Sequence, residues 1–267
     1  MILTFPRALW KQRELWWRLS EREVLGRYRG SILGIGWSFL NPLAMLAVYT
    51  LVFSQVFKAR WGTHADMGPL GFAINLFAGL IVFNLAAECL NQAPGIVVSN
   101  PNYVKKIIFP LEVLGSVTVG SAFFHAFASL IVLVVFELIA THAIPITILW
   151  LPLVWIPLLL ALLAATWALA ALGVFIRDIG QIVNVFMSML MFLSPIFFPA
   201  SALPPRWQPL LALNPLSFVI EETRAVTVEG RAPSMSYLIL GTVFGVIMAE
   251  LSLRGFSKAK RAFADVM

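Results

Sequence analysis

Residues 27–43 read RYRGSILGIGWSFLNPL, and within them a cationic segment gives way to an apolar one. Arg27 and Arg29 end a segment that holds seven Lys and Arg, and no charged residue follows between Gly30 and Phe57. A helix that crosses a bilayer needs about 20 consecutive apolar residues. The stretch therefore predicts a membrane-spanning helix whose first end is held at the membrane surface by arginines.

The composition of the whole chain indicates the same class of protein. Of the 267 residues, 60% are hydrophobic and 12% are charged, whereas soluble domains carry about 25% charged residues. So few charges cannot cover a soluble domain with polar surface, and the chain is expected to be a membrane protein. Its single cysteine, Cys89, excludes a disulfide framework and a cysteine-based metal site.

Long stretches without Asp, Glu, Lys or Arg give the expected spans. The stretch 113–176 is interrupted only by Glu137 and is far too long for one crossing, but the segment ATHAIPI at 140–146, with Pro145, divides it in two. The sequence therefore predicts an all-α membrane protein with six transmembrane helices. Their expected ranges are 34–57, 69–89, 114–139, 146–173, 179–199 and 233–253.

The distribution of Lys and Arg predicts the orientation of the chain. An even number of crossings puts both termini on the same side of the membrane. That side, with the 90–112 loop and the 174–178 turn, carries fourteen Lys and Arg, whereas the opposite side carries five. Because cytoplasmic segments carry the excess of Lys and Arg, both termini are expected in the cytoplasm.

The segment before the first span has its own pattern. Basic residues alternate with Trp and Leu along residues 7–29, which predicts an amphipathic helix lying in the headgroup plane. Two interpretations stay open. The arginines either anchor the first span alone, or Arg22, Arg27 and Arg29 also bind an anionic lipid phosphate, whose geometry the guanidinium group matches.

Two connecting segments do not look like ordinary loops. Residues 200–232 are too apolar for a solvated loop and too charged and proline-rich for a span, which favours two short helices that dip into the outer leaflet and turn at Asn214-Pro215. An outer loop packed on the bundle is the alternative. In the 90–112 loop, residues 100–112 are expected to form a short cytoplasmic helix that either transmits motion from a partner or only connects two spans.

Several kinds of active site have no sequence support. None of the six lysines stands in a G-x-x-x-x-G-K-[ST] motif, so the chain cannot bind ATP through a P-loop of its own. The three histidines are isolated, and His125 is expected to be a hydrogen-bonded interior side chain. Glu88, Glu137 and Glu250 lie near the ends of spans rather than at mid-bilayer, which disfavours proton or sodium coupling. Energy for transport would then come from another polypeptide.

Five segments in a fixed order resemble a known family, the permease (transmembrane) subunit of ATP-binding-cassette polysaccharide exporters, most closely the O-antigen type of the ABC-2 membrane family. The resemblance runs from about residue 10 to the C-terminus. The segments are REVLGRYRGSILGIGWSFLNPL at 22–43, NPNYVKKIIFPLE at 100–112, FIRDIG at 175–180, SPIFFP at 194–199 and LNPLSFVIEETR at 213–224.

The resemblance implies a transport subunit of the bacterial inner membrane and not an enzyme. It implies a homodimer that works with two copies of a separate P-loop ATPase, which would hold the ATP and Mg, while this chain needs no cofactor and binds no nucleic acid. The cargo would be a lipid-linked (polyprenyl-diphosphate) polysaccharide such as O antigen, and membrane lipids would surround the dimer. The implied parts are an interface helix at 1–33, a six-helix transmembrane domain at 34–253 with a coupling segment at 91–112 and an external gate at 200–232, and a basic tail at 254–267.

Candidate residues follow for each part. The resemblance implies lipid headgroup contacts at Arg22, Arg27, Tyr28 and Arg29. It implies contacts that couple the ATPase to the permease at Asn100, Tyr103, Lys105, Lys106, Arg177 and Asp178. It implies an external gate at Trp207, Asn214, Pro215, Glu221 and Arg224.

Residues that line the glycan tunnel are expected from helical spacing. Residues four apart share a helix face, and aromatic rings with amides suit a sliding sugar chain. The two sets are Asn41, Met45, Tyr49 and Phe53 on the first span, and Asn184, Ser188 and Phe192 on the fifth. The alternative for each residue is ordinary helix packing.

Other functions stay open on the sequence alone. The same architecture could export capsule, teichoic acid, or a small lipid or drug. A membrane enzyme acting on lipid-linked sugars would need clustered acid and base groups, and the only such cluster on the outer side is Glu221, Glu222 and Glu229.

Overall fold

The computed structural model describes residues 4–52, 69–104, 109–200 and 204–266, and within these ranges it contains helices and no strands. The longer helices are α2 (Arg13–Arg27), α3 (Trp37–Leu51), α4 (Pro69–Gln92), α6 (Glu112–Thr141), α7 (Leu151–Phe175), α8 (Ile179–Leu193), α10 (Pro215–Thr227) and α11 (Met235–Ala259). The shorter elements are α1 (Thr4–Lys11), α5 (Pro101–Val104), α9 (Gln208–Leu213), α12 (Phe263–Val266), and the 3₁₀ turns η1 (Gly34–Gly36), η4 (Ala93–Gly95), η5 (Ile146–Trp150) and η7 (Lys260–Ala262).

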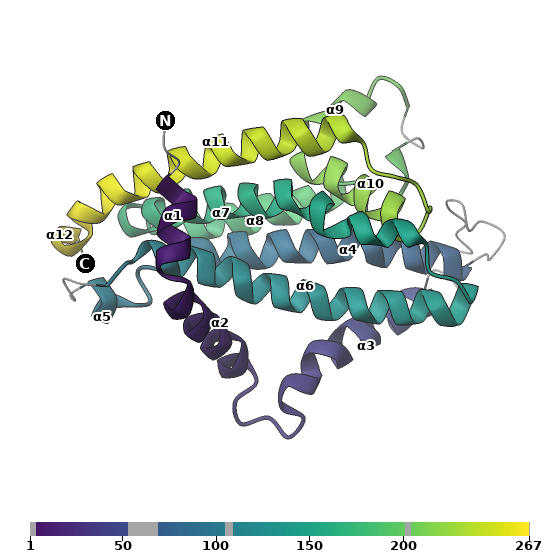
Figure 1. The fold of residues 1–267 in the computed structure, drawn as a ribbon, viewed down its shortest axis with the longest axis horizontal. Coiled ribbons are helices and arrows are strands. Elements are labelled where there is room, and N and C mark those ends of the chain that lie inside the picture. Colours follow the sequence, from purple (N-terminus) through teal and green to yellow (C-terminus); the bar gives the residue numbers. More distant parts are fainter. Residues whose placement is uncertain (1–3, 53–68, 105–108, 201–203, 267) are drawn as a thin grey trace.

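Most of the long helices run back and forth along one axis, as expected for a multi-pass membrane protein (Figure 1). Five segments among the described residues are long and apolar enough to cross a bilayer. They are Gly34–Leu51, Leu70–Gly95, Glu112–Thr141, Ile146–Phe175 and Met235–Ala262. The helix α8 is apolar but shorter. It ends at Leu193 rather than at the predicted residue 199, because Ser194 is extended and precedes Pro195, which disfavours helical backbone.

The core of the bundle is built around α4. This helix contacts α3, α6, α7, α8 and α10, and its side chains from Phe72 to Leu80 are almost fully buried. A helix that is apolar on all sides is expected in the interior. By contrast, only 11% of the α3 span is buried, so α3 lies at the periphery of the single chain.

Glycines allow two close approaches between elements. A Cβ atom on Gly245 of α11 would lie 2.8 Å from the Cβ of Leu160 of α7. A Cβ atom on Gly173, near the end of α7, would clash with the carbonyl oxygen of Pro94 in η4. Small residues at such positions let helix backbones pack closely, which is a common way to associate helices in membranes.

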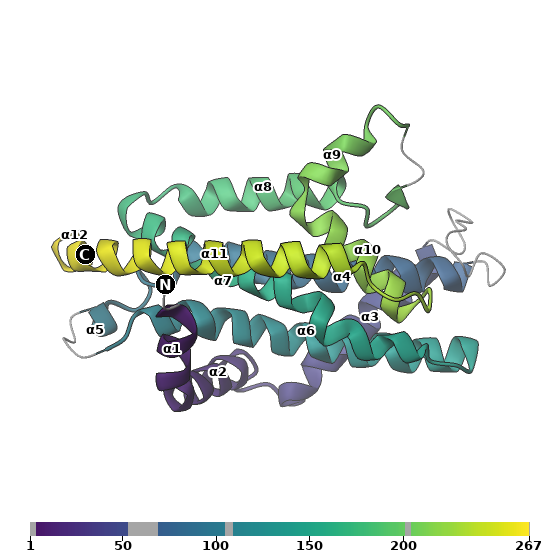
Figure 2. The same ribbon diagram turned by 45° about the horizontal axis from the view of Figure 1, so that its top comes forward.

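The N-terminal segment forms two helices where the sequence predicts one over residues 7–29. The helical backbone breaks at Gln12, and α1 and α2 then follow different directions (Figures 1 and 2). The backbone N–H of Phe5 donates to Glu250 of α11 (3.1 Å), and the indole N–H of Trp16 donates to the carbonyl of Ser116 in α6 (2.9 Å). Because α1 is bonded to α11 and α2 to α6, the two helices wrap around one end of the bundle.

The two ends of the bundle hold different connecting helices. Both termini lie toward the end where α5 is found (Figures 1 and 2). Within the predicted helix 100–112, the structure gives only α5, while residues 105–108 lie outside the described ranges and α6 begins at Glu112. The predicted pair of short helices over 200–232 corresponds to α9 and α10, which meet at Asn214.

Candidate functional site

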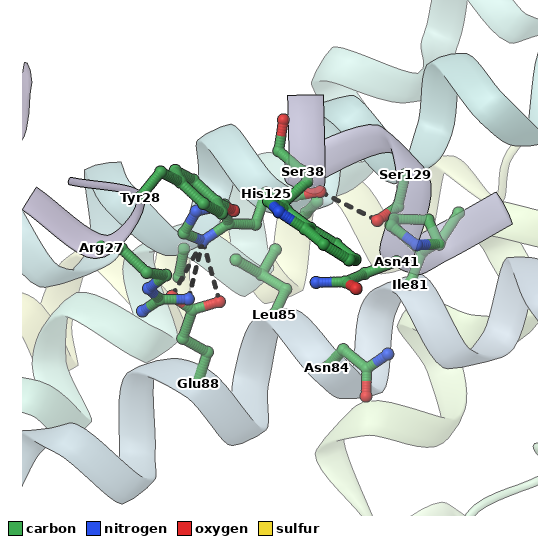
Figure 3. A pocket seen from close by; sticks show the side chains of 14 residues that line it. Arg27, Tyr28, Ser38, Asn41, Ile81, Asn84, Leu85, Glu88, His125 and Ser129 are labelled. Atoms are coloured by element: carbon green, nitrogen blue, oxygen red, sulfur yellow. Dashed lines mark hydrogen bonds and ion pairs between the residues drawn. The ribbon is translucent and has the colours of Figure 1, made fainter. Parts of the chain in front are cut away.

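A cluster of three charged or polar side chains joins α2, α4 and α6. Arg27 Nη2 lies 2.6 Å from Glu88 Oε1, and His125 Nδ1 lies 2.9 Å from the same oxygen (Figure 3). Arg27 Nη1 lies 3.2 Å from His125 Nδ1. A carboxylate can only accept, so His125 Nδ1–H donates to Glu88, and Arg27 cannot donate to that nitrogen in the same state. Glu88 is therefore the common acceptor for both partners.

These three side chains form one end of a pocket of about 180 Å³. Asn41, at the start of α3, and Asn84, on α4, lie farther along the same pocket (Figure 3). The side chain of Arg27 is 39% exposed, whereas that of Glu88 is 18% exposed. The guanidinium therefore stays accessible from the pocket mouth while the carboxylate lies deeper.

The turn between α2 and α3 brings the pocket residues together. α2 ends at Arg27, and the chain reverses through Gly30 (φ 84°) and Gly34 (φ 51°) before α3 begins. Positive φ angles are readily adopted only by glycine, so the quoted stretch RYRGSILGIG contains the residues that this turn requires. The turn places the first residues of α3 against α4 and α6.

The predicted headgroup residues occupy three different environments. Arg27 and Tyr28 line the pocket, and the ring of Tyr28 meets His125 edge-on with centroids 5.9 Å apart. Burial raises the pKa of the Tyr28 hydroxyl, although Arg27 opposes the shift, so the hydroxyl stays a donor at neutral pH. Arg29 is exposed, and Arg22 donates to the hydroxyl of Tyr103 (3.0 Å).

The pairing of Glu88 with Arg27 is not predicted by the sequence, which shows Glu88 only as an ionisable residue near the end of a span. The expectation that His125 is a hydrogen-bonded interior side chain is confirmed by its contact with Glu88. The available signal was that α4 and α6 each place one ionisable residue at matching depth, which is rare inside apolar spans unless the residues pair.

The predicted tunnel residues lie on α3 and α8, two apolar helices with few buried residues. On α3, Asn41 and Met45 are exposed and Tyr49 is half-buried, while Phe53 lies outside the described residues. On α8, Asn184, Ser188 and Phe192 are exposed. The hydroxyl of Ser188 donates to the carbonyl of Asn184 (2.9 Å), but the amide of Asn184 is open to the surroundings.

The predicted coupling residues gather at the end of the bundle that holds the termini. The ring of Tyr103 stacks on Phe109 with centroids 4.1 Å apart, and Asn100 Nδ2 donates to the carbonyl of Ile96 (2.9 Å). Lys105 and Lys106 lie outside the described residues.

The turn between α7 and α8 lies next to the same region. Arg177 and Asp178 are exposed in this turn, and the backbone carbonyl of Asp178 accepts from the N–H of Gln181 (3.0 Å). The close approach of Gly173 to Pro94 places the turn beside η4. Arg177 and Asp178 are therefore available to a partner at this end.

At the other end, Arg224 holds α10 to the bundle. Its side chain is 2% exposed and donates to the carbonyls of Asn75 (2.8 Å), Ile196 (2.9 Å) and Pro195. Glu221 Oε1 lies 3.8 Å from Arg224 Nη1. The guanidinium thus connects α10 to α4 and to the turn that follows α8.

The other predicted gate residues define the shape of the α9–α10 pair. Asn214 Oδ1 accepts from the N–H of Leu216 (2.9 Å), and its amide donates to Ser194 Oγ (2.8 Å). Pro215 is the first residue of α10, where a missing N–H is tolerated. Trp207, just before α9, is 47% exposed with the guanidinium of Arg206 5.5 Å from its ring.

Comparison with known proteins identifies the family. The family model for ABC-2 type transporters matches residues 14–228. The chain belongs to the ABC-2 type transporter family. It is 26% identical over 266 residues to the O-antigen export system permease protein RfbA of Myxococcus xanthus, covering 99% of both chains. It is 22% identical to a protein of the same name from Klebsiella pneumoniae (93% of both chains), and 25% identical to the polysialic acid transport protein KpsM of Escherichia coli (83% of this chain, 85% of that protein).

Membership of the ABC-2 family confirms the resemblance drawn from the five sequence segments. The family match covers α2 from residue 14 onward, the Arg27–Glu88–His125 cluster and the α9–α10 pair. Among the described residues, no group of three or more His, Cys, Asp or Glu is placed to hold a metal ion.

Proposed function

We propose that this chain is the transmembrane subunit of an ATP-driven exporter that moves lipid-linked polysaccharide, of the O-antigen type, across the bacterial inner membrane. The observation that carries the proposal is the similarity, over nearly the whole chain, to a permease named for O-antigen export. A separate subunit with a P-loop would bind ATP and Mg and hydrolyse the nucleotide, because this chain has no such motif.

The proposed topology has six crossings with both termini in the cytoplasm. The five long spans and α8 supply the six crossings. With 15 residues, α8 is about 22 Å long, which is less than the hydrocarbon thickness of roughly 30 Å. The turn at Ser194–Pro199 and the pair α9–α10 would complete this crossing from within the outer leaflet. Non-helical backbone is tolerated at that depth when protein groups satisfy its hydrogen bonds. Here the guanidinium of Arg224 donates to the carbonyl of Ile196 in this turn.

A homodimer is proposed from the exposed faces of α3 and α8. Asn41 and Asn184 expose amide groups on otherwise apolar helices. Polar groups in a membrane face the protein interior or a water-filled cavity rather than lipid. Two copies that bring these helices together would turn the amides toward a shared conduit, where they could bind sugar hydroxyls.

The end of the bundle that holds α5 is the proposed docking site for two copies of the ATPase. Tyr103 on α5 accepts a hydrogen bond from Arg22 on α2. A displacement of α5 by the ATPase would therefore be transmitted to α2. Arg177 and Asp178 lie in an exposed turn at the same end. These residues are proposed contacts of the coupling machinery.

The pocket at Arg27 is the proposed binding site for the diphosphate of the lipid-linked substrate. A guanidinium binds phosphate through paired, charge-assisted hydrogen bonds. Arg27 is positioned at the end of α2, next to the first residues of α3, and more than a third of its side chain is exposed. Tyr28 supplies a hydroxyl beside it.

Purification of the complex tests the proposed function. The tagged chain, expressed with its neighbouring genes, is expected to co-purify with a P-loop ATPase in equal amount. Deletion of its gene is expected to remove surface polysaccharide and to leave drug sensitivity unchanged. Failure to recruit an ATPase, or unchanged surface polysaccharide, would contradict the proposal.

Capsular polysaccharide is the second candidate cargo. The similarity to a polysialic acid transport protein, over 83% of this chain, favours it. The sequence of the partner ATPase would distinguish O antigen from capsular polysaccharide. A C-terminal sugar-binding domain on the ATPase is expected only for an exporter that binds the end of its O-antigen chain.

An enzyme acting on lipid-linked sugars has less support. Glu222 accepts from the N–H of Ser234 (3.0 Å), and Glu229 pairs with Arg231 (3.4 Å). Glu221 lies beside Arg224 (3.8 Å), so all three outer carboxylates are engaged in local structure. Full activity after Gln substitution of Glu221, Glu222 and Glu229 together would exclude the enzyme.

A further inference from the structure

Two apolar cavities lie between the N-terminal helices and the bundle, one on each side of Trp16. The first, of about 560 Å³, is lined by residues of α1, α2, α6 and α7, including Leu9 and Leu159. The second, of about 440 Å³, is lined by α2, α6 and Ile35, and includes Phe127. Neither cavity shares a residue with the pocket at Arg27.

Trp16 is fixed as the partition between the cavities. Its indole N–H donates to the carbonyl of Ser116 (2.9 Å). A Cβ atom on Gly120 would lie 2.8 Å from Cζ2 of the indole, so the ring packs directly on the backbone of α6. Trp16, Gly120 and Phe123 line both cavities, which are therefore adjacent spaces with a common wall.

A cationic group is held at the edge of the first cavity. Arg13 lines this cavity, and its guanidinium lies 5.2 Å from the centre of the Trp10 ring and donates to the carbonyl of Trp10 (3.4 Å). The second cavity has Glu21 at its edge. A negatively charged group is therefore favoured beside Arg13 and disfavoured beside Glu21.

The surroundings select the kind of molecule that fills these spaces. Residues 4–29 contain seven Lys and Arg and three Glu, so the segment that covers the cavities attracts an anionic membrane surface. An apolar cavity offers no polar partners to hold water but can bind an apolar molecule, and the surrounding membrane supplies hydrocarbon chains. Two adjacent apolar cavities with one cation at the edge match a molecule with two hydrocarbon chains and one negative headgroup.

We infer that an anionic diacyl phospholipid of the membrane binds beneath the N-terminal helices, with one acyl chain in each cavity, Trp16 between the chains and Arg13 on the phosphate. The lipid fills the space between α2 and the helices α6 and α7, and it thereby stabilises the position of the interface helices. The inference does not depend on the identity of the exported molecule.

Native mass spectrometry of the purified full-length chain tests the site. The detergent-solubilised protein is incubated with equal amounts of dioleoyl phosphatidylglycerol, dioleoyl phosphatidylcholine and a polyprenyl phosphate, and the bound lipids are counted. The wild type is expected to retain one phosphatidylglycerol per chain. Arg13→Gln is expected to lower this retention at least fivefold. Lys11→Gln, which removes the same charge from a residue that lines neither cavity, is expected to leave it unchanged.

A second pair of variants tests the cavities themselves. Leu159→Trp would fill the first cavity and is expected to abolish retention, whereas Val243→Trp, at an exposed position on α11 that lines neither cavity, is expected to have no effect. Because Arg13 is exposed, Arg13→Gln is informative even if Leu159→Trp fails to fold. Equal retention of phosphatidylcholine, preferred retention of the polyprenyl phosphate, or wild-type retention by Arg13→Gln would overturn the inference.

Discussion

Arg27 of α2 and Glu88 of α4 form an ion pair with 2.6 Å between Nη2 and Oε1. The same carboxylate accepts from His125 of α6. The last residue of α2 is thus bonded directly to α4 and is linked to α6 through the shared carboxylate of Glu88. The group proposed to bind the diphosphate of the substrate is already bound to a carboxylate of the protein, so the substrate would have to compete with Glu88.

Removal of this competition gives the first test. Glu88→Gln is expected to tighten the binding of a polyprenyl diphosphate by up to about fivefold, because a partly exposed ion pair contributes about 1 kcal/mol at most. Arg27→Gln is expected to weaken binding, and the double variant is expected to behave like Arg27→Gln alone. Binding can be measured with a fluorescent polyprenyl diphosphate. Independent effects of the two substitutions would show that Glu88 and the diphosphate do not share Arg27.

Export provides a test of the same residues in the cell. Arg27→Ala combined with Arg29→Ala is expected to reduce surface polysaccharide while the protein still folds and recruits its ATPase. Recruitment is checked by co-purification, and surface polysaccharide by immunoblotting. Arg18→Ala, an exposed arginine on α2 outside the pocket, serves as the control. Wild-type export by the double variant would contradict the headgroup role.

The buried arginine of α10 predicts a stability effect. Arg224→Met would remove the charged donor to the carbonyls of Asn75 and Ile196, and a hydrogen bond that involves a charged group contributes about 1.5–3 kcal/mol. A total loss of roughly 3–6 kcal/mol in the free energy of unfolding is expected. Thermal unfolding in detergent measures it, with the exposed Arg231→Met as the control. An unchanged melting temperature would show that Arg224 does not hold the α9–α10 pair.

The contact between α2 and α5 predicts an effect on coupling. Tyr103→Phe removes the hydroxyl that accepts from Arg22 but keeps the ring that stacks on Phe109. ATP hydrolysis by the complex is expected to continue while export per ATP falls about twofold to fivefold, as expected for the loss of one hydrogen bond to a charged group at the surface. Parallel assays of ATPase activity and export measure the ratio. Arg22→Gln is expected to give the same defect, and an unchanged ratio in both variants would exclude this route.

Charge reversal at Lys105 and Lys106 is a further test of the coupling segment. Both lysines stand in the segment NPNYVKKIIFPLE, which the resemblance implies couples the ATPase to the permease. Lys105→Glu combined with Lys106→Glu is expected to uncouple ATP hydrolysis from export by repelling the partner surface. Wild-type coupling in this variant would move the contact to another element.

The long spans could be predicted from the sequence because their signal is local. Each of α4, α6, α7 and α11 contains a long apolar stretch, and the few Asp, Glu, Lys or Arg residues that these helices hold lie toward their ends. The break near Pro145 separates α6 from η5. The early end of α8 was predicted less well. The apolar pattern continues through SPIFFP, but Pro195 disfavours helical backbone at Ser194 and the helix ends there. Hydropathy measures only side-chain polarity and does not contain this restriction on the backbone.

The side-chain cluster could not be predicted because its members come from three helices. Arg27 was a candidate on its own, since cations at a membrane surface suit phosphate. Its partners Glu88 and His125 become partners only when α4 and α6 are packed together. Arg224 shows the same limit. The charge count placed it among outer-side residues, whereas the fold surrounds its guanidinium with backbone carbonyls.

Reconstitution tests the central claim most directly. Proteoliposomes that contain this chain and its ATPase partner would be loaded with lipid-linked polysaccharide on the side of the nucleotide-binding subunits. The account predicts that ATP, but not a non-hydrolysable analogue, moves the glycan to the opposite leaflet, where a membrane-impermeant lectin detects it. Equal lectin binding with and without ATP hydrolysis would contradict the assignment of this chain as a polysaccharide export permease.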